Sequence, residues 1–536
     1  MLQRKSEISG RPARATPEQR WVLGLSSLAS FMVILDALVV ATALTAIRRH
    51  LGASLGDLEW TVNAYTLSFA VLLMTAAAFG NRLGRRRVFA AGLGLFAVSS
   101  AACALAPDVG ALIAARAVQG AGAAMIMPTA LALLNGAFPP ARRGWAIGIY
   151  GSVTALAAVL GPVFGGAVTQ GLGWPWIFWL NVPVGLVAIP LVLTRLRETA
   201  GAGGTVDVPG LLLVTAAALG LVWGLVRGNS AGWGSAETAG SLAAGTVAAL
   251  AFVAWERRAA SPMLPLRLFR ARAFSAGNAA IFLLNASLTG AIFLMPQFQQ
   301  VVLGQDPFRA GLRLLPWGIV PFLIAPRAGA LADRVGARPL VVTGLLGQAA
   351  GMAWIAAIAT PGVSYWTLVV PMCMSGAALG LAIPALTRSV TSTVAAADMG
   401  TASGAFSTMR QLGGAFGVAV FGAAFAATGN YASPSAFNSG FVTASIVGAG
   451  IALAGAAVGM VLPRRGNRPA PVAAGELEPG RLVRAAGVMG DLGSGELGSG
   501  EVASGELVSD HLGSGDSAGA RCGAAGTAGG AAGATR

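Results

Sequence analysis

The sequence predicts an all-α polytopic membrane protein with fourteen transmembrane helices. Of its 536 residues, 55% are apolar and only 11% are charged, whereas a soluble chain needs about a quarter charged residues to cover its surface. The apolar residues recur in runs of roughly 20, the length that crosses the hydrocarbon core of a bilayer. We therefore expect the lipid bilayer as the main partner, and the plasma or inner cell membrane as the location.

The apolar runs follow one another with short connections. The first run exceeds a signal-peptide core, so we expect an uncleaved first helix after a polar N-terminus. We expect the fourteen spans near 21–44, 58–79, 87–106, 110–134, 145–168, 177–194, 208–227, 237–255, 274–302, 311–330, 339–359, 366–387, 400–427 and 438–462.

Basic residues are distributed unequally between the two sides of these spans. Nearly all of the 36 basic residues are arginines, because Lys5 is the only lysine. The N-terminus and the loops after even-numbered spans carry most of them. The loops after odd-numbered spans carry Arg48, Arg49, Arg227, Arg309 and Arg313. The positive-inside rule then predicts that both termini are cytoplasmic, and the net charge of +15 reflects topology rather than nucleic-acid binding.

An internal repeat divides the chain into two halves. The segment 77–86 after the second span and the segment 329–338 after the tenth carry Arg and Gly at matching offsets. Their alignment pairs spans 1–6 with spans 9–14 and leaves spans 7 and 8 as an insertion. Two six-helix bundles around a central cavity are typical of secondary transporters.

The predicted organisation has five parts. Beyond Pro463 the chain is rich in Gly, Ala and Ser, so we expect a disordered cytoplasmic tail. The parts are an N-terminus at 1–20, an N-terminal bundle at 21–194, the inserted helices with their loops at 195–273, a C-terminal bundle at 274–462, and the tail at 463–536.

Asp36 is the one carboxylate that we expect inside the apolar core of a span. A charged side chain at this depth costs a few kcal/mol, so such residues are rarely idle. It is either a protonatable transport residue or an internal hydrogen-bonding partner that fixes helix packing. Arg116, in the fourth span, needs an anion or backbone carbonyls as partners, and Asp36 is the candidate anion.

Small residues mark the fifth span. Gly161 and Pro162 precede Gly165 and Gly166. Proline removes a backbone donor and bends a helix, while glycines permit close helix contacts. This run predicts a bent and closely packed helix.

Taken together, these residues resemble the major facilitator superfamily, and within it the fourteen-span drug:proton antiporters, over roughly residues 20–462. The resemblance implies a major facilitator fold of two six-helix bundles plus two inserted helices. It also implies proton coupling by Asp36 and Arg116. Its conformational motifs match Asn81, Arg82, Gly84 and Arg85 in the first loop, Gly329, Asp333, Arg334, Gly336 and Arg338 in its repeat, and Gly161, Pro162, Gly165 and Gly166 in the fifth span. Segments 174–185 and 410–415 are similar to stretches found mainly in fourteen-span members.

The first loop departs from the family pattern at two positions. Asn81 stands where the family usually has an aspartate that holds a conformational lock, and Ala77 stands where glycine is usual. Asn81 is able to cap a helix N-terminus, but it supplies no charge. We therefore expect a weaker lock, or one carried by Asp333.

The energy source is expected to be an ion gradient. With Lys5 as the only lysine, a phosphate-binding Gly-x-x-x-x-Gly-Lys-[Ser/Thr] loop is excluded. A proton carried by Asp36 alone gains about 2.3 kcal/mol per 100 mV, which supports a roughly 50-fold gradient of a neutral substrate. We expect a monomer that exports bulky, amphipathic, neutral or singly charged drugs or antibiotics and confers resistance. It needs no cofactor or metal, since three cysteines and two histidines are too scattered to form a site.

Three other functions compete with export. Proton-coupled uptake disagrees with the Gly161–Pro162 motif, a membrane enzyme needs a cluster of acids, histidines or cysteines that is missing from the sequence, and a sensor needs an output domain. The substrate is not identified by the sequence. Its polar contacts are expected among Asp36, Gln119, Asn278, Asn285, Gln297 and Arg410, with Gln299 and Gln300 as further candidates.

Overall fold

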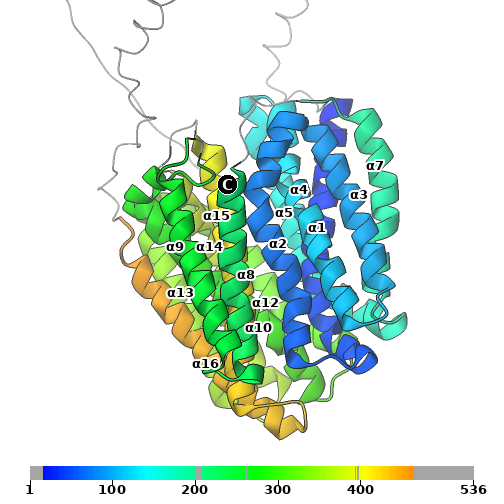
Figure 1. The fold of residues 1–536 in the computed structure, drawn as a ribbon, viewed down its shortest axis with the longest axis vertical. Helices are drawn as coiled ribbons and strands as arrows, with labels where there is room; N and C mark the ends of the chain where they lie inside the picture. Colours follow the sequence, from blue (N-terminus) through cyan, green and yellow to red (C-terminus); the bar gives the residue numbers. More distant parts are fainter. Residues whose placement is uncertain (1–15, 200–206, 261, 393, 395–397, 464–536) are drawn as a thin grey trace, which may run out of the picture. The chain divides into compact units, whose positions relative to one another are not determined.

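The structure is a computed structural model that describes residues 16–199, 207–260, 262–392, 394 and 398–463 (Figure 1). Within these residues, 14 helices are long and apolar enough to cross a bilayer. This confirms the predicted helical membrane fold. The predictions for residues 1–15 and for the tail beyond Pro463 lie outside the described residues.

The N-terminal half begins four residues earlier than predicted. Thr16 and Gln19 form a capping box at the start of the first helix, and Gly52, with a φ of 65°, ends it. A second capping box, of Ser54 and Asp57, starts the next helix directly. The helices of this half are α1 (Pro17–Leu51), α2 (Leu55–Leu83), α3 (Arg85–Ala104), α4 (Val109–Ala137), α5 (Pro140–Gly171), the short α6 (Trp176–Trp179) and α7 (Asn181–Arg195).

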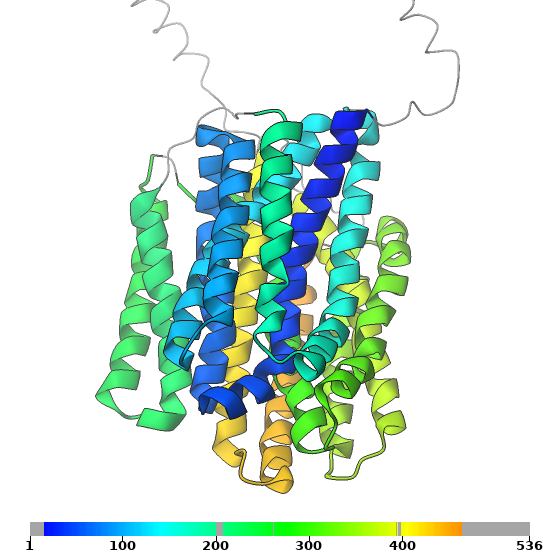
Figure 2. The same cartoon turned by 90° about the vertical axis from the view of Figure 1, so that its right-hand side faces the viewer.

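The insertion forms a helical hairpin of α8 (Val208–Ala231) and α9 (Ala236–Glu256). Two glycines bring its helices together, because a Cβ added to Gly220 would lie 2.9 Å from the Cα of Gly245. The hairpin lies on the flank of the other helices (Figure 2), where α8 packs against α2 and α15 (Met399–Thr428).

The C-terminal half repeats the helix order of the first. It starts with a 3₁₀ turn, η2 (Leu266–Arg270), and its helices are α10 (Arg272–Val301), α11 (Pro307–Arg313), α12 (Leu315–Val335), α13 (Ala337–Ile358), α14 (Tyr365–Thr391), α15 and α16 (Pro434–Gly459). The tenth span, predicted as one helix, is divided at Leu314 into α11 and α12.

Two glycines support the repeat. Gly84 joins α2 to α3 with a φ of 103°, and Gly336 joins α12 to α13 with a φ of 88°. Side chains other than glycine rarely adopt such angles. The loops after the second and tenth spans therefore make the same sharp turn for the same reason.

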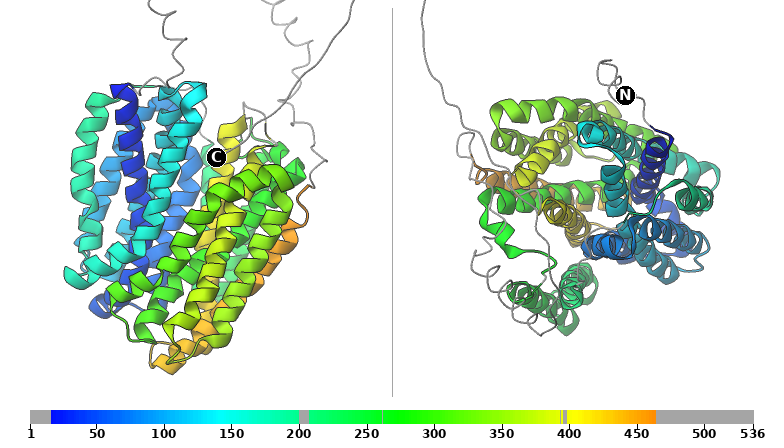
Figure 3. Two further views of the ribbon diagram at one scale, coloured as in Figure 1. Left: turned by 180° about the vertical axis from the view of Figure 1, so that it is seen from behind. Right: turned by 90° about the horizontal axis from the view of Figure 1, so that it is seen from above.

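The halves lie side by side, with the hairpin outside both (Figure 3). We call the end where α1 begins the terminus side, and the opposite end the far side. At the far side, Gln300 of α10 donates a 3.0 Å hydrogen bond to the Thr42 carbonyl of α1 and also bonds to Thr45. A Cβ on Gly166 would lie 2.9 Å from the Cα of Phe308. These contacts hold the halves together at the far side.

Candidate functional site

Asp36 lies midway along α1 and is 1% exposed. The Nη1 atom of Arg116, on α4, lies 2.5 Å from the Oδ2 atom of Asp36. The structure thus brings the two residues predicted for proton coupling into one buried ion pair. Asp36 and Arg116 are 80 residues apart in the sequence. They meet because α1 and α4 pack against each other.

Two amides complete the surroundings of Asp36. Gln119 lies three residues after Arg116, on the same face of α4, and donates a 2.9 Å hydrogen bond to Asp36 Oδ1. Asn181, at the start of α7, donates a 2.8 Å bond to the same oxygen. Both amides also donate to the Ser100 hydroxyl of α3, at 2.6 Å and 3.1 Å. We call Asp36, Arg116, Gln119, Asn181 and Ser100 the Asp36 network.

Arg116 has partners on a further helix. Its Nε atom donates to the carbonyl of Thr61 on α2 at 3.3 Å, and its guanidinium lies 4.1 Å from the centre of the Tyr65 ring. Both partners considered for this arginine, a carboxylate and a backbone carbonyl, are therefore present. Such complete pairing is what allows a charge to stay buried.

The link between α1 and α4 depends on the opposite charges of Asp36 and Arg116. Protonation of Asp36 would remove the negative charge that attracts Arg116 and would weaken the link between α1 and α4. Because every member of the network is nearly inaccessible, the proton would reach it only after the surrounding helices move.

Glycines hold the helices around this network close together. A Cβ on Gly161 of α5 would lie 2.7 Å from Leu38 Cβ, and one on Gly165 would lie 2.7 Å from Val39 Cα. Leu38 and Val39 lie two and three residues after Asp36 on α1. The small residues predicted as a conformational motif therefore bring α5 into backbone contact with the helix that carries Asp36.

The first-loop motif lies at the terminus side. Asn81 does not use its capacity to cap a helix, because it lies in the last turn of α2, where its Oδ1 accepts hydrogen bonds from Arg85 at 3.1 and 3.3 Å. Gly84 takes the N-cap position of α3 without a side-chain bond. Glu198, which the sequence analysis missed, accepts a 3.0 Å bond from the Arg86 backbone and joins α3 to the segment after α7.

The second copy of this motif is the segment 329–338, at the end of α12 and the start of α13. Gly336 makes the turn already noted, Arg334 is exposed and Arg338 is half-buried. Among the described residues, no atom lies within 4 Å of a Cβ added to Gly329. The side chain of Asp333, to which the lock was provisionally assigned, lies outside the described residues.

The predicted contacts of the C-terminal half do not join the Asp36 network. Gln297 donates to the carbonyl of Phe293 in its own helix, at 2.6 Å, and accepts a 2.5 Å bond from Tyr431. Asn285 donates a 2.5 Å bond to the Arg410 carbonyl, and Asn278 donates a 2.9 Å bond within α10. These amides act here as contacts within and between helices.

Glu59 corrects the expectation that Asp36 is the only acid within an apolar span. It lies in the second turn of α2, is 2% exposed, and its Oε2 atom has no hydrogen-bond partner among the described residues. The sequence places it at the edge of a predicted span, which hid its burial. Asn181 was also missed as a site residue, although the segment that contains it stood out.

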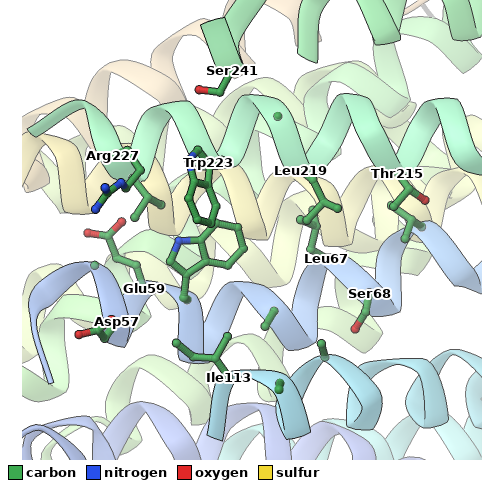
Figure 4. Close-up of a pocket in the computed structure, with 18 of the residues that line it drawn as sticks. Asp57, Glu59, Leu67, Ser68, Ile113, Thr215, Leu219, Trp223, Arg227 and Ser241 are labelled. Carbon is green, nitrogen blue, oxygen red and sulfur yellow. The ribbon is translucent and has the colours of Figure 1, made fainter. Parts of the chain in front are cut away.

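A cavity of about 1290 Å³ lies between the N-terminal half and the inserted hairpin (Figure 4). Its walls come from α2, α4, α8 and α9, with Ala426 of α15. Glu59, Trp60 and Ser68 line it from α2, and Trp223 and Arg227 line it from α8. The described residues contain no group of three or more His, Cys, Asp or Glu that would hold a metal ion.

Comparisons with known proteins agree with this arrangement. The chain is 36% identical to the tetracenomycin C resistance and export protein of Streptomyces glaucescens over 424 residues. The aligned region covers 78% of each chain. The chain is 37% identical over 424 residues to a cephamycin export protein of Amycolatopsis lactamdurans, which covers 78% of this chain and 87% of the relative.

Solved structures share the fold at lower sequence identity. An inward-facing bacterial homologue of the human lysosomal transporter Spinster aligns with a TM-score of 0.59 and 18% identity, over 84% of this chain and 98% of the other. A D-xylose–proton symporter aligns with a TM-score of 0.57 and 15% identity, over 81% and 96%. The model of the Major Facilitator Superfamily matches residues 26–418. This protein therefore belongs to the major facilitator superfamily of membrane transporters.

Proposed function

We propose that this protein is a proton-coupled antiporter that exports bulky amphipathic drugs or antibiotics from the cytoplasm by alternating access. The observation that carries the proposal is the buried ion pair of Asp36 and Arg116, which joins α1 to α4 beside a glycine-lined contact with α5. Relatives named for the export of, or resistance to, antibiotics support the direction and the class of substrate.

The proposed cycle uses Asp36 as the proton carrier. When Asp36 is ionised, Arg116, Gln119 and Asn181 hold it and keep the helices together. When Asp36 takes up a proton, the attraction for Arg116 weakens, and the loss of this contact lowers the free-energy cost of rearranging the halves. Release of the proton on the cytoplasmic side restores the ion pair.

The location of the protein follows from the same proposal. The distribution of arginine supports cytoplasmic termini, and in this proposal the cell membrane supplies the proton gradient. A single carrier group sets one proton per cycle, and we propose that a monomer completes the cycle, since both halves belong to one chain.

The test is proton-driven efflux in inside-out vesicles. We expect Asp36→Asn to abolish efflux of an amphipathic substrate while expression and membrane insertion persist, because asparagine retains the shape but carries no proton. Asp306→Asn is the matched control, since asparagine also caps the N-terminus of α11, where Asp306 accepts a bond from the Arg309 backbone. Efflux in the wild type must stop with an uncoupler. Efflux that survives in Asp36→Asn would refute the assignment of the carrier.

A further inference from the structure

We propose that the cavity beside the inserted hairpin is a second ligand site, which binds an amphipathic monovalent cation with the Glu59 carboxylate as its counter-ion. This inference rests on the proposed export of amphipathic compounds, and it assigns a charge to the compound that this site accepts. The evidence is an acid without a partner, an aromatic and apolar lining, and the position of the cavity.

Glu59 is held where a charge is unfavourable. It is almost fully buried, and its Oε2 atom has no hydrogen-bond partner in the described part of the chain. A Cβ on Gly422 of α15 would lie 2.8 Å from that oxygen, so the absence of a side chain at this glycine leaves room for the carboxyl group. A buried carboxylate without a partner is costly, and a cation in the cavity would supply the partner.

The other charged residues at the cavity already have partners. Arg227 donates to Glu237 at 2.9 and 3.1 Å. Asp57 accepts the backbone and hydroxyl bonds of Ser54 in the capping box of α2. Charge complementarity at this cavity therefore depends on Glu59.

The remaining lining fits the organic part of such a ligand. Trp60 and Trp223 both line the cavity and contact each other, with ring centres 5.5 Å apart and planes tilted by 49°. Aromatic faces attract cations, and Leu67, Leu219 and Ile113 line the space beside them (Figure 4). The volume is ample for a drug-sized molecule, whose sites occupy about 300–1,000 Å³.

The cavity is accessible from outside the helical bundle. Three of its lining residues on α8 are exposed, with Leu212 at 64%, Leu219 at 44% and Trp223 at 43%. Because these side chains line the cavity and are exposed, the cavity is open along α8. An amphipathic cation that has partitioned into the membrane would therefore reach Glu59 without crossing the protein.

The site lies directly behind the Asp36 network. Ala117, which follows Arg116 on α4, lines the cavity, and Arg116 itself bonds to the carbonyl of Thr61, two residues beyond Glu59 on α2. A ligand in the cavity thus contacts both helices that hold the arginine. This wall connects ligand binding to the proposed proton carrier.

Equilibrium binding of radiolabelled tetraphenylphosphonium to the full-length protein in nanodiscs tests the site, with empty nanodiscs subtracted. We expect Glu59→Gln to weaken binding about tenfold or more, because it removes the counter-ion. We expect Leu219→Trp to reduce binding by filling the cavity. Asp108→Asn is the matched control that leaves binding unchanged, since it also removes a carboxylate near the far side but retains the helix cap.

Further measurements distinguish a bound cation from other occupants of the cavity. Tetraphenylborate has the same shape and the opposite charge, so its binding should not fall in Glu59→Gln. Equal tetraphenylphosphonium affinity in wild type and Glu59→Gln would overturn the proposal, as would a cavity that retains only copurified phospholipid. Tetraphenylphosphonium binding to wild type and Glu59→Gln tests this site, whereas efflux by Asp36→Asn tests the antiport proposal, so a failure of one remains distinguishable from a failure of the other.

Discussion

The N-terminal half buries Asp36, Glu59 and Arg116 within its helices, whereas the described helices α10–α16 bury amides and hydroxyl groups and leave Arg410 of α15 half-buried. The two halves have the same helix order and the same glycine turn after their second long helices. Their difference therefore concerns chemistry rather than architecture. In the C-terminal half, the acid classed as buried is Asp398, which lies just before α15.

This difference indicates separate roles for the two halves in the proposed transport cycle. An ion pair inside a membrane responds strongly to one proton. Protonation of the carboxylate leaves the arginine as an unpaired charge in surroundings of low dielectric constant. An amide contact such as that of Gln297 with Tyr431 has no such response near neutral pH. We infer that the N-terminal half senses the proton and that the C-terminal half supplies the surface against which it moves.

The largest expected effect comes from removing one member of the ion pair. Arg116→Met leaves Asp36 buried with two amide donors but no cation, so we expect the free energy of unfolding to fall by about 3 kcal/mol. Unfolding in mixed detergent micelles measures the loss. The double variant Asp36→Asn with Arg116→Met should lose less than Arg116→Met alone. Equal losses in both would mean that the pair does not stabilise the half.

A smaller effect is expected in the C-terminal half. Gln297→Leu removes the acceptor of the Tyr431 hydroxyl, and polar contacts between membrane helices contribute about 0.6–1.7 kcal/mol. Efflux should stay within a few-fold of wild type, and Tyr431→Phe should behave alike. If Gln297→Leu abolished efflux as Asp36→Asn is expected to do, the division between the halves would be wrong.

Much of the fold could be predicted because membrane helices are set by a simple rule. Runs of about 20 apolar residues have to form helices in lipid, so the fourteen spans, the insertion and the repeat were readable. The division of the tenth span at Leu314 was not recognised, although α11 carries Arg309 and Arg313 and Pro316 stands in the first turn of α12. Tertiary packing decides such breaks.

The site was predictable only in its charged centre. Asp36 and Arg116 stood out because each is a charge in an apolar run. Asn181 was not recognised, since an amide near a span end is common and its role depends on how α7 packs against α1. Glu59 was missed because burial by α15 and α8 raises no local signal in α2.

The contribution of the first loop to the comparison can be measured with Asn81→Asp. The new carboxylate would supply the charge that a lock between the halves needs, and an exposed ion pair is worth about 0.2–1 kcal/mol, or up to about fivefold in an equilibrium. We expect the restored lock to favour opening of the far side. Labelling of Phe308→Cys, with Cys103, Cys373 and Cys522 replaced, should then increase. Unchanged labelling would make Asn81 a turn residue only.

The smallest effect concerns the salt bridge of the C-terminal half that lies outside the membrane spans. The Arg267 guanidinium donates two 2.7 Å bonds to Asp398 and thereby holds the pKa of this carboxyl below its usual value, which is about 3.9. A lowered pKa means that the stabilisation is complete above about pH 4 and disappears as the pH falls through the folded-state pKa. Partial exposure of Arg267 limits the gain to about 1 kcal/mol or less.

Thermal unfolding of wild type and Asp398→Asn at pH 6 and pH 3 measures this contribution. We expect the wild type to unfold at a slightly higher temperature at pH 6 and the difference to shrink at pH 3, because a protonated Asp398 no longer pairs with Arg267. The side chain of Asp398 makes no capping bond to α15, so the substitution tests the ion pair alone. A difference that grew on acidification would mean that Asp398 is stabilised in its neutral form, and the C-terminal half would then hold a proton-sensitive group of its own.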